Sequence, residues 1–206
     1  RKTVKKPGIL VAGATGAGKS SLINHLFGME VATEGSGKPV TDRVTRYEPE
    51  KVDVVLYDTR GYEIGDEKAQ QFYKEVVGYV KEANESKDVK NHIHLVWYCI
   101  SAANKRVTPM DLDIIASLQG LAKVCIVLTQ IDTATVVELK EMRDTIAKKL
   151  PDMPAFGVSI DPRVPAESQE WDEMLDWSMD NLESGMQLAL AQALGKELRI
   201  KRMQAD

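Results

Sequence analysis

The sequence predicts an α/β fold in three layers, with a mostly parallel six-stranded sheet between helices on both faces. Short apolar runs of strand length alternate along the 206 residues with longer segments whose apolar residues recur at helical spacing. Most of the runs are almost wholly apolar, as expected for strands that helices cover on both sides. Helical connections of this length produce right-handed crossovers between parallel strands.

Three of the predicted strands lie in the first third of the chain. Gly8–Ala12 is a short apolar run, and a helix over Ser20–Phe27 follows it and ends before a glycine. Met29–Pro39 contains glycines without periodicity, so we expect a long loop there. Arg43–Glu48 and Val52–Tyr57 are predicted strands, the first of them antiparallel at one edge of the sheet.

The rest of the chain alternates helix and strand without an internal repeat. Charged or amphipathic segments predict helices, and buried apolar runs predict strands. In order, we expect a helix at Asp66–Glu85, a strand at His92–Ile100, a helix from Pro109 to Leu118, a strand at Ala122–Thr129, a helix at Val136–Leu150, a strand at Ala155–Ile160 and a helix around Glu170–Leu182.

The last segment has a different pattern. Apolar residues recur every four positions from Met186 to Leu198, and the stripe ends in a basic cluster. We therefore expect a globular domain over residues 1–184 and an amphipathic helix over 185–206, which could lead into a further domain.

The composition is that of a globular chain, with 43% hydrophobic and 28% charged residues. A net charge of −4 gives no sign of a broad basic surface for nucleic acid. Cys99 and Cys125 each lie inside an apolar run, which predicts buried free thiols and a reducing compartment. No apolar run approaches the length of about 20 residues that spans a bilayer, so we expect a cytoplasmic protein without a transmembrane segment.

A glycine-rich motif lies between the first strand and the first helix. Residues 13–20 fit the pattern G-x-x-x-x-G-K-[ST] at every position. Glycines let successive backbone N–H groups converge on phosphates at the positive end of a helix, while the lysine adds charge and the serine offers a hydroxyl to Mg²⁺. The residues expected to bind the nucleotide here are Gly13, Ala14, Thr15, Gly16, Ala17, Gly18, Lys19, Ser20 and Ser21.

A second motif follows the strand Val52–Tyr57. Asp58 stands at the end of that strand, where its carboxylate would hold Mg²⁺ through water beside the loop. Gly61 follows three residues later and could present its backbone N–H to the γ-phosphate without a side chain in the way. We therefore predict a D-x-x-G motif that reads the terminal phosphate.

A third motif indicates which base is bound. Thr129, Gln130 and Asp132 close an apolar strand at the carboxyl edge of the sheet, where such folds bind nucleotides. At this point the sequence resembles the GTPases, whose [NT]-K-x-D motif uses the aspartate to accept two hydrogen bonds from guanine. Gln130 departs from that pattern and implies weaker stacking on the base. Ser159, at the end of the last strand, resembles the final base-contacting motif of the same proteins.

Two threonines compete for the role of closing on Mg²⁺ and the γ-phosphate. Thr45 falls inside a predicted strand, whereas Thr41 lies on the preceding loop. The string Lys38-Pro-Val-Thr41 is also similar to a loop of Era-like GTPases at a comparable distance from the phosphate loop. We therefore expect Thr41 to act with Lys19 and Gly61 in catalysis, and Ser20, Thr41 and Asp58 to hold the metal.

With these motifs in order, residues 8–180 resemble the Era/TrmE/septin-like class of translation-factor-related GTPases. Asp58–Tyr62 and His94–Tyr98 look most similar to bacterial YfjP-type predicted GTPases. Ras-like enzymes place a glutamine after the glycine of the second motif to orient water, and this chain has Tyr62 there. The resemblance therefore implies a slow GTPase that needs a partner or a dimer.

Three functions remain open at this point. The first is a switch protein that uses Mg²⁺ to hydrolyse GTP to GDP and phosphate, with an effector on its switch loops. The alternative is an assembly module that forms septin-like or dynamin-like dimers across the nucleotide face with little hydrolysis. A nucleotide kinase is disfavoured, because the guanine motif is present and no arginine-rich lid is evident.

Overall fold

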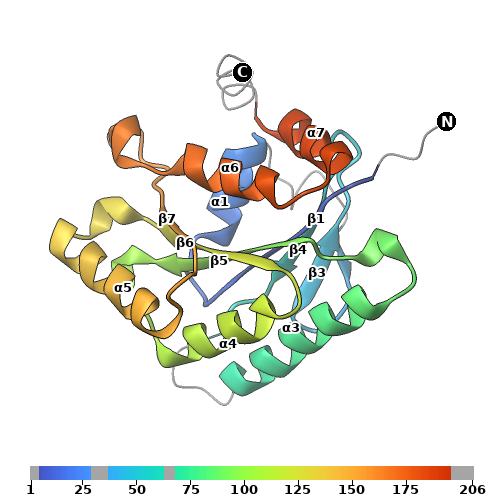
Figure 1. Cartoon of the computed structure of the whole chain (residues 1–206), viewed down its shortest axis with the longest axis horizontal. Coiled ribbons are helices and arrows are strands. Elements are labelled where there is room, and N and C mark those ends of the chain that lie inside the picture. Colours follow the sequence, from blue (N-terminus) through green and yellow to red (C-terminus); the bar gives the residue numbers. More distant parts are fainter. Residues whose placement is uncertain (1–4, 29–36, 63–67, 196–206) are drawn as a thin grey trace.

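The computed structural model describes residues 5–28, 37–62 and 68–195, and it contains a seven-stranded sheet between two helical layers (Figure 1). The strand order is β2-β3-β4-β1-β5-β6-β7. The strands are β1 (Gly8–Gly13), β2 (Lys38–Pro39), β3 (Val44–Tyr47), β4 (Val55–Thr59), β5 (Leu95–Ser101), β6 (Lys123–Thr129) and β7 (Ala155–Gly157).

Helices cover both faces of this sheet. α1, α6 and α7 lie on one face, and α3, α4 and α5 lie on the other (Figure 1). Their bounds are α1 (Lys19–Phe27), α3 (Lys68–Glu85), α4 (Pro109–Gln119), α5 (Val136–Lys149), α6 (Trp171–Asp180) and α7 (Ser184–Ala193). The predicted three-layer α/β fold is therefore confirmed.

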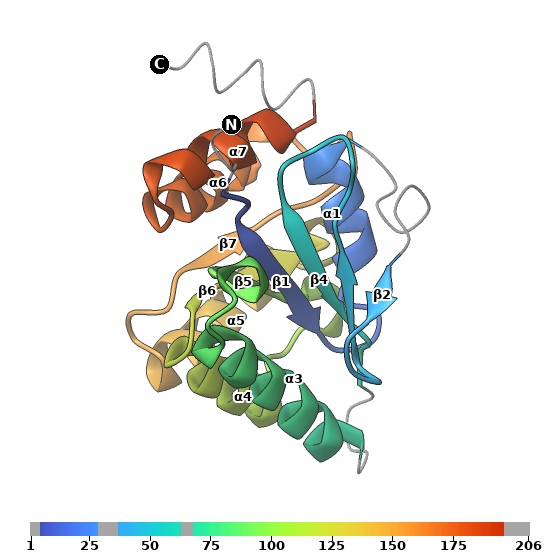
Figure 2. The ribbon, with the colours of Figure 1, turned by 90° about the vertical axis from the view of Figure 1, so that its right-hand side faces the viewer.

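The sheet is parallel except at one edge. β1 pairs in parallel with β4 and β5, β5 with β6, and β6 with β7, whereas β3 runs antiparallel to β4. β2 extends this antiparallel edge, with Pro39 opposite Thr45 (Figure 2). The prediction of six strands missed β2, because two residues carry no periodicity, and an edge position is where a proline is tolerated.

Each face of the sheet has its own hydrophobic core. On one side, residues such as Tyr98 and Ile126 pack with Phe72, Ile115 and other side chains of α3 and α4. On the other side, strand residues pack with side chains of α1, α6 and α7. The alternation of side chains along each strand supplies both clusters, so the central strands are buried throughout.

The C-terminal helix α7 belongs to the second of these cores. Met186 and Leu190, two residues of the predicted apolar stripe, are buried in the cluster that also contains Leu26 of α1. The carbonyl oxygen of Leu26 accepts a 2.8 Å hydrogen bond from the N–H of Gly195, which follows the helix. The helix ends at Ala193, because Leu194 is extended, so the structure does not continue the predicted helix there; residues 196–206 of that prediction lie outside the described residues.

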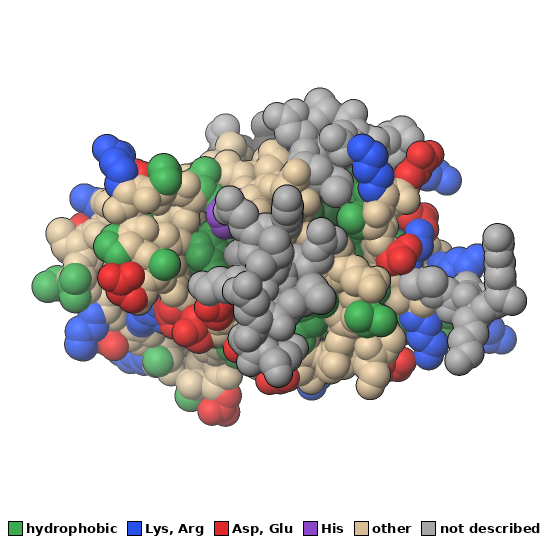
Figure 3. Space-filling view, turned by 90° about the horizontal axis from the view of Figure 1, so that it is seen from above, with side chains coloured by type: hydrophobic (Ala, Val, Ile, Leu, Met, Phe, Trp, Pro, Cys, Tyr) green, Lys and Arg blue, Asp and Glu red, His purple; other side chains and the backbone are tan. Residues whose placement is uncertain are grey.

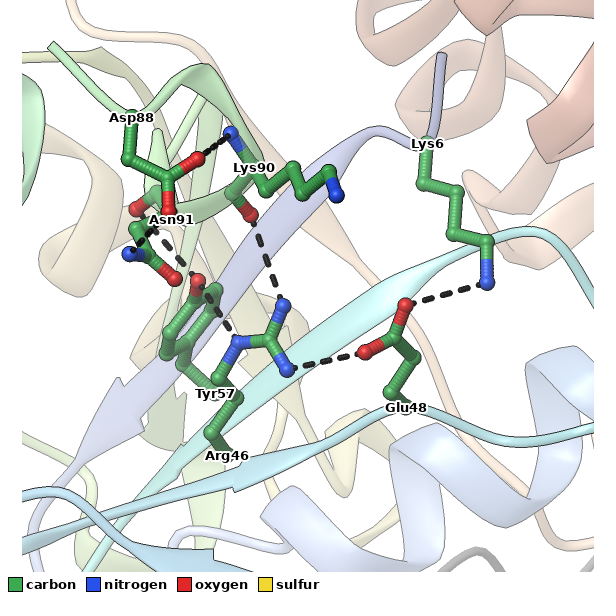
Figure 4. A network of polar contacts seen from close by, with 7 residues as sticks. All are labelled: Lys6, Arg46, Glu48, Tyr57, Asp88, Lys90 and Asn91. Carbon is green, nitrogen blue, oxygen red and sulfur yellow. Dashed lines mark hydrogen bonds and ion pairs between the residues drawn. The ribbon is translucent and has the colours of Figure 1, made fainter. Parts of the chain in front are cut away.

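A polar network joins β3, the strand next to the edge strand β2, to neighbouring parts of the fold (Figure 4). Arg46 donates to the hydroxyl of Tyr57 at 3.3 Å and to the carbonyl of Lys90 at 3.4 Å. Its third contact is Glu48 at 3.0 Å, and Glu48 also accepts from Lys6 at 3.0 Å. Because β3 is close to the sheet edge, these bonds hold it in place where packing alone is sparse.

On the face that carries α6 and α7, the described residues show acidic and basic side chains interspersed among uncharged ones (Figure 3). Among the described residues, no helix is both long enough and apolar enough to cross a bilayer.

Candidate functional site

The phosphate loop joins the buried end of β1 to the first turn of α1. Gly13, Gly16 and Gly18 have backbone φ values of 145°, 80° and 81°, which residues other than glycine rarely adopt. A Cβ atom on Gly13 would also lie 2.3 Å from the carbonyl oxygen of Cys99. The glycines of the motif are thus required by the backbone, and Thr15, Gly16 and Ser20 are exposed at the top of the loop.

Lys19 lies folded into this loop. Its Nζ donates to the carbonyl oxygens of Gly13 and Ala14 at 3.1 and 3.2 Å, and the residue is only 9% exposed. Burial, the larger effect, lowers the pKa of Lys19, while nearby Cys99 and Asp58 act in the opposite direction. A buried ammonium held by carbonyl oxygens is positioned to exchange them for phosphate oxygens.

Asp58 is the carboxylate that is the candidate ligand for a metal ion at this site. Burial raises its pKa, and Lys19 and the backbone N–H of Thr59 oppose that rise. Its Oδ1 is buried and has no hydrogen-bond partner among the described residues. Such an oxygen is costly to bury unless an ion or an ordered water meets it. The donor set of Asp58 with the Ser20 hydroxyl fits Mg²⁺, which takes oxygen ligands and keeps several waters.

Gly61 lies directly against the phosphate loop. A Cβ atom there would be 2.5 Å from the backbone nitrogen of Thr15 and 2.8 Å from its hydroxyl oxygen. Next to it, the carbonyl oxygen of Tyr62 accepts a 3.0 Å hydrogen bond from the N–H of Thr15. The structure therefore brings the D-x-x-G motif onto the loop, and only a glycine allows this approach.

Thr41 is placed differently from the other predicted metal ligands. Its hydroxyl oxygen accepts hydrogen bonds from the N–H groups of Arg43 at 3.0 Å and Val44 at 2.9 Å, so it caps the turn between β2 and β3. Thr45 lies in the strand β3, as the sequence predicted, and its register partner in β4 is Asp58. No hydrogen bond links Thr41 to the phosphate loop among the described residues.

The other end of the site begins at the carboxyl end of β6. Thr129 is buried, and its hydroxyl donates to the carbonyl oxygen of Ala17 at 2.7 Å. This bond fixes the third motif to the phosphate loop. Gln130 follows with φ of 57° and ψ of 40°, and its Oε1 accepts from the hydroxyl of Ser101 at 3.0 Å.

Asp132 and Ser159 meet although 27 positions separate them in the chain. The hydroxyl of Ser159 donates to Oδ1 of Asp132 at 2.7 Å and accepts from the N–H of Asp161 at 3.1 Å. Ser159 is buried, whereas Asp132 is exposed. The serine therefore orients the carboxylate, and one oxygen of Asp132 is free of protein hydrogen bonds among the described residues.

A pocket of about 400 Å³ lies where these segments meet. Gly18 and Ser21 line it on the side of the loop and α1, and Asp132 and Ile160 line it on the side of the strand ends. Ile160 and Trp171 belong to none of the sequence motifs, and Trp171 also lines the pocket. Trp171 is otherwise a core residue, and its ring stacks on that of His25 with the ring centroids 4.4 Å apart.

Sequence reasoning also missed the residues that hold the motifs in place. Ser101, at the end of β5, bonds Gln130, and Gln169 accepts hydrogen bonds from the N–H of Ser159 and from the indole of Trp171. Isolated polar residues of this kind have no recognisable spacing, so only the fold reveals these contacts.

Comparison with known proteins places this geometry in a family. Residues 8–131, more than half of the chain, match the family model described as 50S ribosome-binding GTPase. Neuronal-specific septin-3 of Rattus norvegicus is 26% identical over 208 residues, covering 88% of this chain and 56% of the septin. Septin-2B of Xenopus tropicalis is 26% identical over 197 residues, covering 82% and 54%. The chain thus spans about half the length of the curated relatives it matches.

Solved structures agree with this fold. The probable GTP-binding protein engB superposes with a TM-score of 0.56 at 16% identity, covering 84% of this chain and 97% of engB. Era from Aquifex aeolicus, in a structure titled as bound to GDP and AlF4⁻, gives a TM-score of 0.57 at 18% identity, covering 87% and 58%. The chain therefore belongs to the P-loop GTPase family described as 50S ribosome-binding GTPase, and the septins are among its relatives.

Proposed function

We propose that this chain is a magnesium-dependent switch that hydrolyses GTP slowly to GDP and phosphate. The observation that carries the proposal is the buried, unpartnered Oδ1 of Asp58 beside Lys19 in the phosphate loop. A buried carboxylate oxygen and a buried ammonium, at the edge where Gly61 meets the loop, form a site for a metal and a polyphosphate together.

Each residue at the phosphate end has a role that follows from its position. Ser20, Thr41 and Asp58 would hold Mg²⁺, which when bound supplies positive charge against the β- and γ-phosphates. Lys19 would exchange its two carbonyl partners for phosphate oxygens. Gly61 would offer its N–H at the terminal phosphate, since it already lies against Thr15.

The switch itself would involve Thr41. In this structure the Thr41 hydroxyl is occupied by the N–H groups of Arg43 and Val44, so contact with a metal requires that turn to open. GTP would favour the open arrangement, because the freed Thr41 hydroxyl could then contact the metal and the γ-phosphate. Loss of the γ-phosphate would remove this interaction and restore the turn. The two states therefore differ in a defined set of backbone hydrogen bonds.

Guanine would be read at the other end of the pocket. Asp132 would accept hydrogen bonds from two donors on the base edge, with Ser159 fixing its orientation. Thr129 couples this region to the loop through Ala17, so base and phosphate binding would reinforce one another. Adenine lacks the two donors and would leave the carboxylate unsatisfied.

Nucleotide binding measured by calorimetry with and without Mg²⁺ tests the proposal. Lys19→Ala should abolish tight binding of GTP and GDP, and Ser20→Asn should remove the magnesium dependence and the GTP-bound state. Lys140→Ala is the matched control, because Lys140 is exposed on α5 and pairs only with Asp144 in the described structure. Unchanged affinity in Lys19→Ala and Ser20→Asn would refute the proposed phosphate site.

A second candidate is a GTP-dependent assembly module. The septin relatives favour it, as does the exposure of Val136 (84%) and Val137 (65%) at the start of α5, close in sequence to Asp132. Light scattering of the protein with GDP and with a non-hydrolysable GTP analogue separates the two functions. A nucleotide-dependent doubling of mass would support assembly, and a constant monomer mass would favour the switch.

Two further expectations belong with this proposal. Residues 1–184 would form the GTP-binding unit, with the helix from 185 as an extension of it. A cytoplasmic location is supported by Cys99 and Cys125, which are free and buried, as thiols are in reducing compartments.

A further inference from the structure

We propose that Ser101, which belongs to none of the nucleotide-binding motifs, is a positioning residue. It would fix the side-chain amide of Gln130 so that the NH₂ group donates to an oxygen of the nucleotide's ribose. The inference rests on the proposed binding of guanine nucleotide, and it adds a residue that sets affinity at the position where this chain carries glutamine.

The hydroxyl of Ser101 has a defined donor and acceptor role. Ser101 is 3% exposed at the end of β5, so water contributes little to its hydrogen bonding. Its Oγ accepts the N–H of Ala103 at 3.2 Å, at the start of the 3₁₀ helix Ala102–Asn104. The hydroxyl proton is then available for the second partner, which is Gln130 at 3.0 Å.

This arrangement decides which way the amide of Gln130 faces. A proton donated by Ser101 requires an acceptor, so the atom of Gln130 that meets it is Oε1 and not Nε2. If the amide were reversed, Nε2 of Gln130 would face the Ser101 hydroxyl, and the hydroxyl proton would have no acceptor. Ser101 therefore selects one of the two amide orientations.

The selected orientation directs the NH₂ group toward the nucleotide pocket. Nε2 of Gln130 is 3.7 Å from the position that a Cβ atom on Gly18 would occupy. It makes no hydrogen bond to another described residue. Gln130 lines the same pocket as Gly18 of the phosphate loop and Asp132, and the ribose must pass through this pocket to join the phosphates to the base.

The backbone conformation of Gln130 supports the inference that its side-chain amide is held in one position. Gln130 and Lys105 are the non-glycine residues with positive φ among those described, and a left-handed conformation persists only where surroundings enforce it. Here Ser101 holds the side chain, and Thr133 donates to the carbonyl oxygen of Gln130 both from its N–H (3.0 Å) and from its hydroxyl (2.6 Å). The surrounding bonds therefore preset the amide before a nucleotide arrives.

The experiment compares GDP affinity in Ser101→Ala, Gln130→Glu and Ser101→Thr by calorimetry. Ser101→Ala and Gln130→Glu should each weaken GDP binding about tenfold, the value of one well-placed hydrogen bond. Ser101→Thr keeps the hydroxyl and should bind like the parent chain. An unchanged affinity in Ser101→Ala or Gln130→Glu would overturn the inference.

A double-mutant cycle separates positioning from a structural role, since Ser101 also caps the 3₁₀ helix through Ala103. In a Gln130→Lys background there is no amide to orient, so Ser101→Ala should have no further effect on GDP affinity. A tenfold loss that persists in that background would show that Ser101 acts on stability and not on Gln130. If Ser101→Ala does not fold, the other two variants still test the inference: an unchanged affinity in Gln130→Glu, or a weakened affinity in a folded Ser101→Thr, would overturn it.

The same titrations distinguish the inference from the proposed function beneath it. If the parent chain binds neither GDP nor GTP, the guanine-nucleotide site itself is wrong. If the parent chain binds GDP tightly and Lys19→Ala does not, while Ser101→Ala and Gln130→Glu match the parent, only the role of Ser101 is wrong.

Discussion

The phenol hydroxyl of Tyr62 donates a 2.5 Å hydrogen bond to Oδ1 of Asp111, which joins the residue after Gly61 to the first turn of α4. The same oxygen accepts from Tyr98 at 2.7 Å, and Oδ2 accepts from the hydroxyl of Thr108 at 2.8 Å. Burial raises the pKa of both tyrosines, so both remain protonated donors across neutral pH. The side chain of Tyr62 therefore serves the core and not the attacking water.

Tyr62→Phe should leave basal GTP turnover unchanged, because the hydroxyl that it removes contacts Asp111 and not the nucleotide pocket. The variant should lose about 1 kcal/mol of unfolding free energy, since Asp111 keeps its other donors. Tyr62→Ala should cost about 3 to 5 kcal/mol through the cavity it leaves. Denaturant unfolding and single-turnover hydrolysis on the same preparations check both values, and a collapse of turnover in Tyr62→Phe would contradict this assignment.

Gly61→Ala should impair turnover much more than it impairs folding. The added methyl group would collide with the backbone of Thr15, so the D-x-x-G segment must withdraw from the phosphate loop. The withdrawal should cost on the order of 2 kcal/mol of stability. Stopped-flow phosphate release measures the effect on hydrolysis.

Gly78→Ala is the matched control for that variant. Gly78 lies in α3 and its Cβ would meet nothing within 4 Å, so the substitution should stabilise the protein by about 0.5 to 1 kcal/mol through helix propensity. Equal losses of turnover in both variants would mean that the contact of Gly61 with the loop has no special importance.

The fold followed from the sequence because its pattern is strong at each level. The pattern of buried apolar strands alternates with segments of helical spacing, and a glycine loop follows the first strand. All of these predict the same three-layer α/β architecture, which the structure shows. Where the sequence failed, the element was short or was set by partners. β2 consists of two exposed residues that form a strand only because Arg46 and Thr45 lie opposite.

The site divides in the same way. The phosphate loop could be located because each of its residue types answers a backbone or charge requirement within eight consecutive positions. The contact between Gln130 and Ser101 could not, since the two residues lie 29 positions apart and Ser101 belongs to no motif. Ser159 was located by its resemblance to a base-contacting motif, but its hydrogen bond to Asp132, 27 positions away, is revealed only by the fold. Thr41 shows a third case, because its residue type predicts a ligand while its hydroxyl here caps a turn.

Asp132→Asn should exchange the preferred base from guanine to xanthine. The amide offers a donor where the carboxylate had an acceptor, and this matches the carbonyl that xanthine has in place of the amino group. Loss of two charge-assisted hydrogen bonds should weaken GTP binding roughly a hundredfold or more. Competition between GDP and XDP for the parent chain and the variant measures the exchange, and a retained preference for GDP would remove Asp132 from base recognition.

Hydrolysis by dilute monomer should be slow, at about 10⁻⁴ to 10⁻² s⁻¹, as in switch GTPases that lack a partner's contribution. The residue after Gly61 has its side chain buried, so the described structure offers no side chain from that position to orient water. Thr41→Ala should lower the rate further, because it removes the hydroxyl proposed to close on the metal and the γ-phosphate. Thr41→Ser keeps that hydroxyl and should retain the parent rate. Single-turnover assays at increasing protein concentration complete the test. A rate that rises with protein concentration would place the missing catalytic contribution on a second copy of the chain. A fast monomer whose turnover does not depend on Thr41 would show that the catalytic loop has been assigned wrongly.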